Sequence, residues 1–489
     1  MIAPTRLPLP IRARISGADA AVWGVAAALT FAVTLLAAHS GPKVPLSVLL
    51  GVLVFLAVLV GFVKAPHVVI ACAIPYFCLL PMMKVLVTAQ LGPTKDVIEI
   101  AAFLAAAVLM LRRRFLREPW EGDTQVLVLT LLLLALYVFN IGTAIRGGNV
   151  VSLEWFHGVR LVGEPLLLML VGMTVADPRK TFHWALKSLI LTVCGAALIG
   201  LFQQVIGPAR LITLGYSYKN QVRTIGGHLR SFGPFDEPFD YAAMVAFGLA
   251  GVLLWAKKRT VVWMLGPVIA AGLAVSFVRG AALSVVALIA LLLARKGYAS
   301  VATVVLGAAA ATAVAFVFLA SQPTPGKVVQ AGPSTYLTLN GRDRSWRVAL
   351  GNPSYWPFGR GVGVFGTAAT RVAAESQTPT LDPRFGQAAD SGYLATASDV
   401  GFIGLGLELA LFTRIIVLLR AAIRRGEGAA WFGLGLFVIF LLDAALRSSL
   451  TGFPTAHLGM LLVGLTLAAT RKPPPISRNL ATLRPEGAR

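Results

Sequence analysis

The sequence predicts an all-α polytopic membrane protein, on three observations. Hydrophobic residues make up 57% of the 489 residues and charged residues only 13%, whereas charged residues are about a quarter of a typical soluble domain. Apolar runs of roughly 17 to 25 residues, the length of a membrane-spanning helix, recur along nearly the whole chain. Short basic segments separate many of these runs, as they do at the cytoplasmic ends of membrane helices. We therefore expect one integral membrane domain over residues 1–489.

Each apolar run is interpreted as one spanning helix. This gives about fourteen helices, within a range of 12 to 14, and the division is least certain at "SFVRGAA", where only a short turn separates two runs. The predicted spans lie near residues 20–38, 44–63, 66–88, 96–111, 124–145, 155–176, 186–206, 239–256, 260–278, 280–295, 299–320, 396–420, 429–446 and 455–470.

The basic residues predict the orientation of these helices. The first 20 residues carry three arginines but no convincing cleavage site follows the first apolar run, which indicates a retained cytoplasmic tail and not a signal peptide. Alternating sides from there puts every short basic connector inside, including "RRRFLREPWEGD", "KKRT" and "RAAIRRGEG". Both termini are therefore expected in the cytoplasm, and residues 471–489 are expected to form a disordered tail.

Two longer segments then face the extracytoplasmic side. They are residues 207–238 and residues 321–395, the second lying before the last three predicted helices. Both exceed the roughly 12 to 15 residues beyond which a loop is usually functional or disordered. Because both contain aromatic residues, in which disordered segments are poor, we expect two ordered extracytoplasmic loops.

Many arginines fall on or near this outer side, against the general bias of basic residues towards the cytoplasm. The guanidinium group offers paired donors to phosphate oxygens and keeps its charge, so this distribution suggests an anionic ligand at the membrane surface. The net charge of +22 is divided between two sides of a bilayer, and no nucleic-acid partner is expected. The arginines concerned are Arg146, Arg160, Arg210, Arg223, Arg230, Arg279, Arg342, Arg344, Arg347, Arg360, Arg371, Arg384 and Arg447.

Two of these arginines interrupt apolar runs. Arg160 lies in "EWFHGVRLVGEPLLLMLVG" and Arg279 in "AVSFVRGAAL". Ionisable groups at membrane depth are costly and normally serve a site or a partner. The alternative for Arg160 is an internal ion pair, because Glu164 follows it by four residues, the spacing that brings side chains together on a helix.

Acidic residues are fewer on the outer side, and two of them lie in "ADSGYLATASDVG" at 389–401. Asp390 fits either an N-cap of the following helix or a general base beside the arginines. Asp399 is the weaker candidate. The cysteines and histidines show no metal-ligand spacing and "GRGVGVFG" lacks the context of a nucleotide loop, so neither a metal nor a cofactor is expected.

Five segments in this order resemble the O-antigen ligase and O-antigen polymerase superfamily, bacterial glycosyltransferases of the cytoplasmic (inner) membrane. They are "RSFGPFDEPFDYAAM", "SFVRGAALSVV", "NGRDRSWRVAL", "PFGRGVGVFG" and "DSGYLATASDVGFIGLGLEL". The resemblance covers roughly residues 155 to 420. It implies a donor glycan linked to undecaprenyl diphosphate, a glycan or glycolipid acceptor, and an extracytoplasmic active site in contact with membrane lipid.

The resemblance also implies roles for single residues. Arg230, Arg279 and Arg342, with Arg160 as a further candidate, correspond to arginines that bind the diphosphate. Asp390 stands where the related ligases usually have a histidine that activates the acceptor hydroxyl, and this difference favours a polymerase or another acceptor. The implied reaction is a metal-independent glycosyl transfer with Asp390 as catalytic base.

Two other functions remain open. A transporter or flippase for a lipid-linked or anionic substrate would use the same intramembrane arginines, although it would favour an inverted repeat, which the sequence does not show. A scaffold that binds anionic lipid headgroups would need neither an ordered loop nor an acid among the arginines. The glycosyltransferase hypothesis requires Asp390 to face a cavity lined by Arg230, Arg279 and Arg342.

Overall fold

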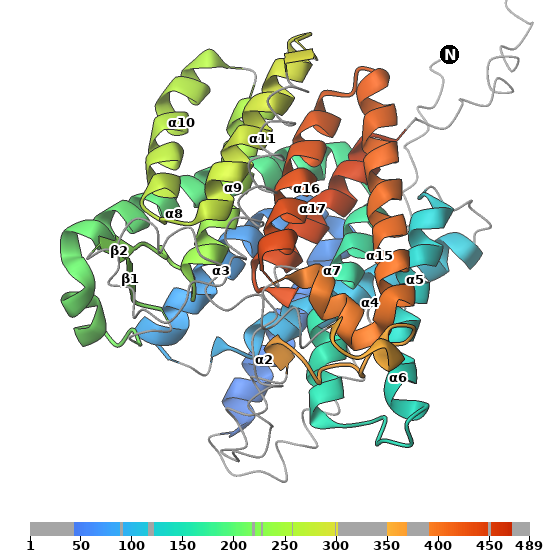
Figure 1. Ribbon diagram of the computed structural model, residues 1–489. Coiled ribbons are helices and arrows are strands. Elements are labelled where there is room, and N and C mark those ends of the chain that lie inside the picture. The colour runs from blue at the N-terminus through green and yellow to red at the C-terminus, as the bar shows by residue number, and fades with distance from the viewer. Residues whose placement is uncertain are drawn as a thin grey trace, which may run out of the picture.

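A computed structural model describes residues 44–88, 91–115, 122–217, 221–225, 228–256, 258–298, 300–301, 350–368, 391–447 and 451–471. Within these ranges the chain is almost entirely helical, with one two-stranded sheet (Figure 1). The elements are α2 (Val44–Lys64), α3 (Pro66–Leu86), α4 (Thr94–Phe115), α5 (Thr124–Phe139), α6 (Ile141–Ala144), α7 (Leu153–Thr174), α8 (Pro178–Thr213), β1 (Arg223–Ile225), β2 (His228–Arg230), α9 (Pro238–Leu254), α10 (Arg259–Ala274), α11 (Arg279–Arg295), the 3₁₀ turn η3 (Pro353–Tyr355), α15 (Gly392–Arg424), α16 (Gly428–Leu446) and α17 (Thr455–Ala469).

Six stretches among the described residues are long and apolar enough to cross a membrane, those of α3, α5 with α6, α7, α8, α15 and α16. Shorter apolar helices accompany them in α2, α9, α10, α11 and α17. The predicted spans at 20–38 and nearly all of 299–320 lie outside the described residues. The all-α polytopic class is thus supported, and the number fourteen stays a prediction.

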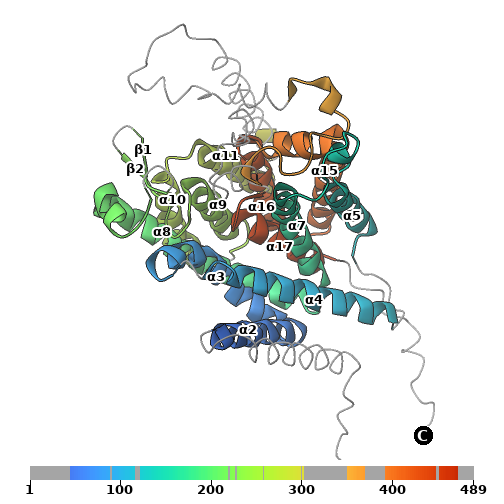
Figure 2. The same ribbon diagram turned by 90° about the horizontal axis from the view of Figure 1, so that it is seen from below.

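Two short helices, α17 and α9, form the centre of the bundle. Every residue of α17 is buried, and nearly every residue of α9 is too. Figure 2 shows α7, α11 and α16 around them, with α3 and α4 along one side and α2 outside those. An apolar helix can face either lipid or protein, and the burial of α17 and α9 shows that other helices surround them.

Glycines let α7 and α17 approach closely. A Cβ on Gly464 would lie 2.0 Å from the Met169 carbonyl oxygen, and one on Gly172 would lie 2.5 Å from that of Leu461. Small residues commonly permit such backbone contact between membrane helices. The pairing fixes the start of α17 beside α7, where buried charges gather.

A sharp bend divides α15 into two arms. Gly401 has φ 72° and ψ −173° inside the helix, and the N–H groups of Phe402 and Ile403 donate to the carbonyls of Trp356 and Pro357. In return, Ser398 accepts from the Arg360 N–H at 2.6 Å. Residues 353–366, which contain "PFGRGVGVFG", are therefore held against the bend.

The predicted loops need boundary corrections. Helix α15 begins at Gly392 and not near 396, so the last residues of the segment 321–395 are helical. Helix α8 continues to Thr213 past a break at Gly207, and the rest of 207–238 includes the β1–β2 hairpin. Residues 302–349, 369–390 and the tail 472–489 lie outside the described ranges.

The basic connectors meet at one end of the bundle. Arg471 donates to the Met173 carbonyl at 2.8 Å, Arg425 to that of Thr470 at 3.0 Å, and Arg179 pairs with Glu427 at 3.2 Å. We call this the basic end.

Near the start of α5, two hydrogen bonds from Arg414 hold the pKa of Asp123 below its usual value.

Candidate anion-binding site

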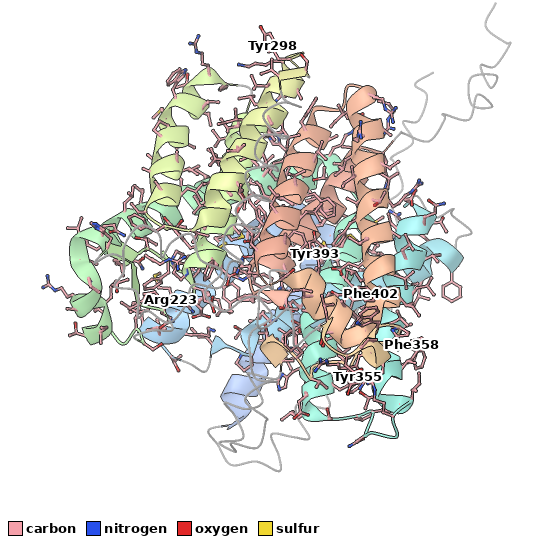
Figure 3. All side chains as sticks on the ribbon, in the orientation of Figure 1. Arg223, Tyr298, Tyr355, Phe358, Tyr393 and Phe402 are labelled. Carbon is pink, nitrogen blue, oxygen red and sulfur yellow. The ribbon has the colours of Figure 1, made fainter. Side chains whose placement is uncertain are left out.

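Two arginines lie opposite each other on the β1–β2 hairpin. The antiparallel register pairs Arg223 with Arg230, and their guanidinium carbons lie 5.8 and 4.8 Å from the centre of the Phe239 ring. Figure 3 shows Arg223 on this hairpin, far from Tyr298 near the basic end. Like charges directly opposite on neighbouring strands are unfavourable, so this register needs a compensating charge.

A third arginine approaches the same ring from the end of α16. The Arg447 guanidinium carbon lies 6.0 Å from the Phe239 centre. Its Nε donates to Asp443 at 2.7 Å and its Nη1 to Asp240 at 2.9 Å, and the Thr455 hydroxyl also donates to Asp240, at 2.8 Å. Arg447 therefore joins α16 to the first turns of α9 and α17.

Four helices begin around this group. Besides α9 and α17, α15 begins where the Gly392 N–H donates to the Arg447 carbonyl at 2.9 Å. Helix α11 begins at Arg279, and a Cβ on the next residue, Gly280, would lie 4.0 Å from an Asp443 oxygen. Helix N-termini carry partial positive charge and unpaired N–H groups. We call Arg223, Arg230, Arg447 and these helix starts the arginine site.

Among the described residues of the arginine site, the negative charges of the acids nearly balance the positive charges of the arginines. Asp240 and Asp443 pair with Arg447, and Glu237 lies 3.8 Å from Arg223. Partial burial and then the nearby Asp240 raise the pKa of Glu237 above its ordinary value. Four helix N-termini add partial positive charge to this nearly balanced set, which gives the site an electrostatic preference for an anion.

The predicted residues divide between this site and elsewhere. Arg230 lies in it, and Arg279 reaches it through its backbone position at the start of α11. Arg342 and Asp390 lie outside the described residues. The N-cap position of α15 belongs to Ser391 and not to Asp390. The required meeting of Asp390 with all three arginines therefore stays a prediction.

Arg160 lies in a different cluster, among buried charges on α4, α7 and α17. Its Nε donates to Glu164 at 2.8 Å and its terminal nitrogen to Asp96. The ion pair with Glu164 is therefore confirmed. Two carboxylates already occupy the guanidinium, and the diphosphate-binding role proposed for Arg160 rests on the sequence alone.

The same cluster contains a triad that resembles a metal site. The ligand atoms of Glu99, Glu164 and His457 lie within 4.8 Å of one another. The ammonium of Lys95, however, lies 2.6 Å from Glu164, 3.3 Å from the His457 Nε2 and 3.6 Å from Glu99. A cation therefore already occupies this position, and we interpret the triad as an internal ion-pair network.

The sequence pattern does not single out Asp240 or Asp443, and Arg447 is only one of many arginines that it places on the outer side. A signal was present, because Asp443 precedes Arg447 by four residues at the end of an apolar helix, the same spacing that singled out Arg160. Nothing in the sequence links Asp240 to either of them, since more than 200 positions separate Asp240 from Arg447.

Comparison with known proteins gives no independent identification: no family model matches this chain, and no curated protein matches it in sequence.

Proposed function

We propose that this protein transfers a glycan from an undecaprenyl-diphosphate carrier to an acceptor sugar hydroxyl, at the extracytoplasmic face of the inner membrane. The observation that carries the proposal is the arginine site. Three arginines surround one phenylalanine ring where four helices begin. Residues from three of the segments that resemble the O-antigen ligase and polymerase superfamily, 230–244, 276–286 and 390–409, contribute to this one place.

A diphosphate suits this arrangement chemically. Guanidinium groups donate paired hydrogen bonds to phosphate oxygens, and helix N-termini favour negative charge. A lipid-linked diphosphate would bring its charge to the end of the helices while its chain stays in the bilayer. The guanidinium groups of Arg230 and Arg223 both lie near the aromatic ring of Phe239, and cation–π contacts with this ring hold them close together.

The proposed reaction is a single displacement. Asp390 takes the proton of the acceptor hydroxyl, the hydroxyl oxygen attacks the anomeric carbon, and the bond from that carbon to the diphosphate oxygen breaks. The leaving diphosphate carries the electron pair, which the arginines stabilise. Asp390 precedes by two residues Gly392, whose N–H is bonded to Arg447. This sequence position supports Asp390 as the base.

The test is turnover by purified full-length protein supplied with an undecaprenyl-diphosphate glycan. We expect release of undecaprenyl diphosphate, and a loss of at least about 100-fold for Arg230→Gln, as when one oxyanion donor is removed. Asp390→Asn is expected to abolish turnover without unfolding the protein. Arg179→Gln, at the basic end, is the matched control and should retain full activity.

The same assay separates the competing functions. Chain growth with donor alone would identify a polymerase, and a strict requirement for a second lipid or glycan acceptor would identify a ligase. A transporter or flippase would move the donor across liposomes without cleaving it. Turnover unchanged in both Arg230→Gln and Asp390→Asn would refute the proposed site.

A further inference from the structure

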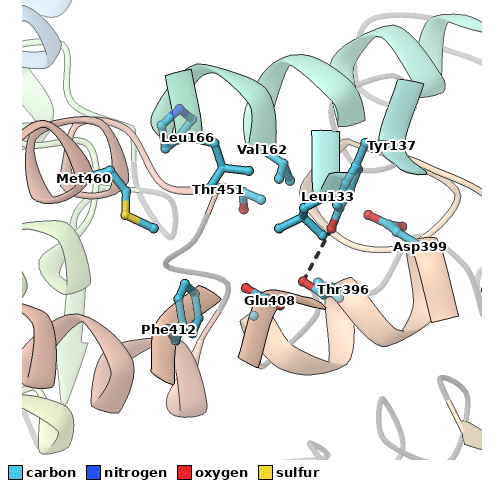
Figure 4. A pocket seen from close by; sticks show the side chains of 13 residues that line it. Leu133, Tyr137, Val162, Leu166, Thr396, Asp399, Glu408, Phe412, Thr451 and Met460 are labelled. Atoms are coloured by element: carbon cyan, nitrogen blue, oxygen red, sulfur yellow. Dashed lines mark hydrogen bonds between the residues drawn. The ribbon is translucent and has the colours of Figure 1, made fainter. Parts of the chain in front are cut away.

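A small cavity lies where the two arms of α15 face α5 and α7 (Figure 4). Its free volume is about 30 Å³, room for roughly two water-sized particles. Leu133, Val162, Leu166 and Phe412 provide much of its apolar lining. A sugar is too large for this space, so its ligand must be very small.

Two acids from one helix line the cavity. Asp399 precedes the bend at Gly401 and Glu408 follows it, and their exposed fractions are 7% and 4%. Among the described residues, neither Asp399 Oδ1 nor Glu408 Oε2 has a hydrogen-bond partner. The described lining includes no lysine, arginine or histidine, so no internal cation compensates these two groups as Lys95 does for Glu164.

The neighbouring donors point towards these acids. The Tyr137 hydroxyl donates to Thr396 at 3.4 Å, the Thr396 hydroxyl is bonded in turn to Glu408, and the Gly363 N–H donates to Asp399. A negative charge on an acid as enclosed as these is costly without a partner, and a bound cation would compensate it.

We propose that this cavity binds a small monovalent cation of the Na⁺ class. Its polar lining consists of carboxylate and hydroxyl oxygens from Asp399, Glu408, Thr396, Thr451 and Tyr137, the ligand type that hard cations prefer. Ca²⁺ needs six to eight oxygen ligands and Mg²⁺ retains several waters, which this volume does not allow. A cation with one water fits. The inference does not depend on the proposed glycosyl transfer.

A cation bound in this cavity would stabilise the bend of α15. One ligand comes from each arm, so a bound cation would hold the two arms at a fixed angle. The first arm begins at Gly392, which is bonded to Arg447, and the second runs to the basic end. The cation would therefore stabilise the position of the helix start that contributes to the arginine site.

The experiment is thermal unfolding of the purified full-length protein in NaCl, KCl or choline chloride at equal ionic strength. We expect a saturable rise of Tm with Na⁺ concentration, a weaker effect of K⁺, and none specific to choline. Asp399→Asn and Glu408→Gln should each shift the Na⁺ midpoint at least about tenfold, because loss of even an indirect partner costs a metal site that much. Glu427→Gln, at the basic end, should behave as wild type.

A direct measurement covers the case in which these variants do not fold. Wild-type protein should bind about one ²²Na⁺ per chain, displaced by unlabelled Na⁺ and not by choline. Equal Tm in NaCl and choline chloride at every pH from about 5 to 8 would show that protons or water alone occupy the cavity, and would overturn the proposal. So would a full Na⁺ response in both acid variants.

Discussion

Arg447 is the residue on which the arginine site depends most. Its side chain is 15% exposed and bonds two carboxylates from different helices, while its carbonyl accepts from the start of α15. Removing one partner of a buried ion pair is far more costly than the pair's net contribution, because the remaining charges stay buried without compensation. Arg447 is thus as important to the fold as to the site.

We predict that Arg447→Gln destabilises the protein by about 3 kcal/mol or more. Asp240 and Asp443 would both lose their cationic partner. Denaturant or thermal unfolding in detergent measures the effect. The matched change Arg179→Gln removes an arginine that is 64% exposed and should cost less than about 1 kcal/mol. Equal stability of the two variants would contradict this account.

The bend in α15 is the helix break that shapes the cation cavity. Gly401 adopts a backbone conformation that residues with a Cβ rarely tolerate, and an added Cβ would lie 2.2 Å from the Pro357 carbonyl oxygen. The bend turns one helix into two walls of the cation cavity. It also holds residues 353–366 at the end of the molecule that contains the arginine site.

We predict that Gly401→Ala destabilises the protein by at least about 1 to 3 kcal/mol, the usual cost of a strained backbone conformation. It should also remove any Na⁺-dependent rise in Tm. Gly406→Ala is the control in the same helix, because an added Cβ there meets nothing within 4 Å. That change replaces a helical glycine and should stabilise the protein by about 1 kcal/mol. Matching effects of the two substitutions would refute the role of the bend.

At the scale of the whole molecule, the two ends differ in chemistry. The connectors of the basic end bind carbonyls at helix C-termini, including those of Thr470 and Met173. The other end gathers the starts of α9, α11, α15 and α17 around acids and arginines. The positive-inside rule predicts that the basic end faces the cytoplasm and the arginine site the extracytoplasmic side.

Cysteine labelling tests this orientation. In a variant without Cys72, Cys78 and Cys194, Glu427→Cys should react with a membrane-impermeant maleimide only from the cytoplasmic side. Asn149→Cys, in the exposed turn before α7, should react only from outside. Labelling of both positions from one side would refute the alternating topology, and reversed labelling would place the arginine site in the cytoplasm.

The sequence by itself determined the membrane class, because hydrophobic run length is a local property that a bilayer selects directly. It also determined the basic end and the ion pair of Arg160 with Glu164, since both depend on spacing along one segment. Most predicted spans coincide with described helices within a few residues. The ends of helices were predicted less well, as at Gly392. Contacts with distant segments decide which backbone N–H groups of the first turn find an acceptor, and these contacts are not visible in the sequence.

Only the tertiary structure decided which distant residues meet. The contact of Asp240 with Arg447 and Thr455 joins three helices, and no periodicity in the sequence contains that information. The cation cavity depends on a bend that brings Thr396 and Glu408 together, although they lie twelve positions apart in one helix. A straight helix would separate them by about 18 Å, so Asp399 and Glu408 gained a common role only from the break at Gly401.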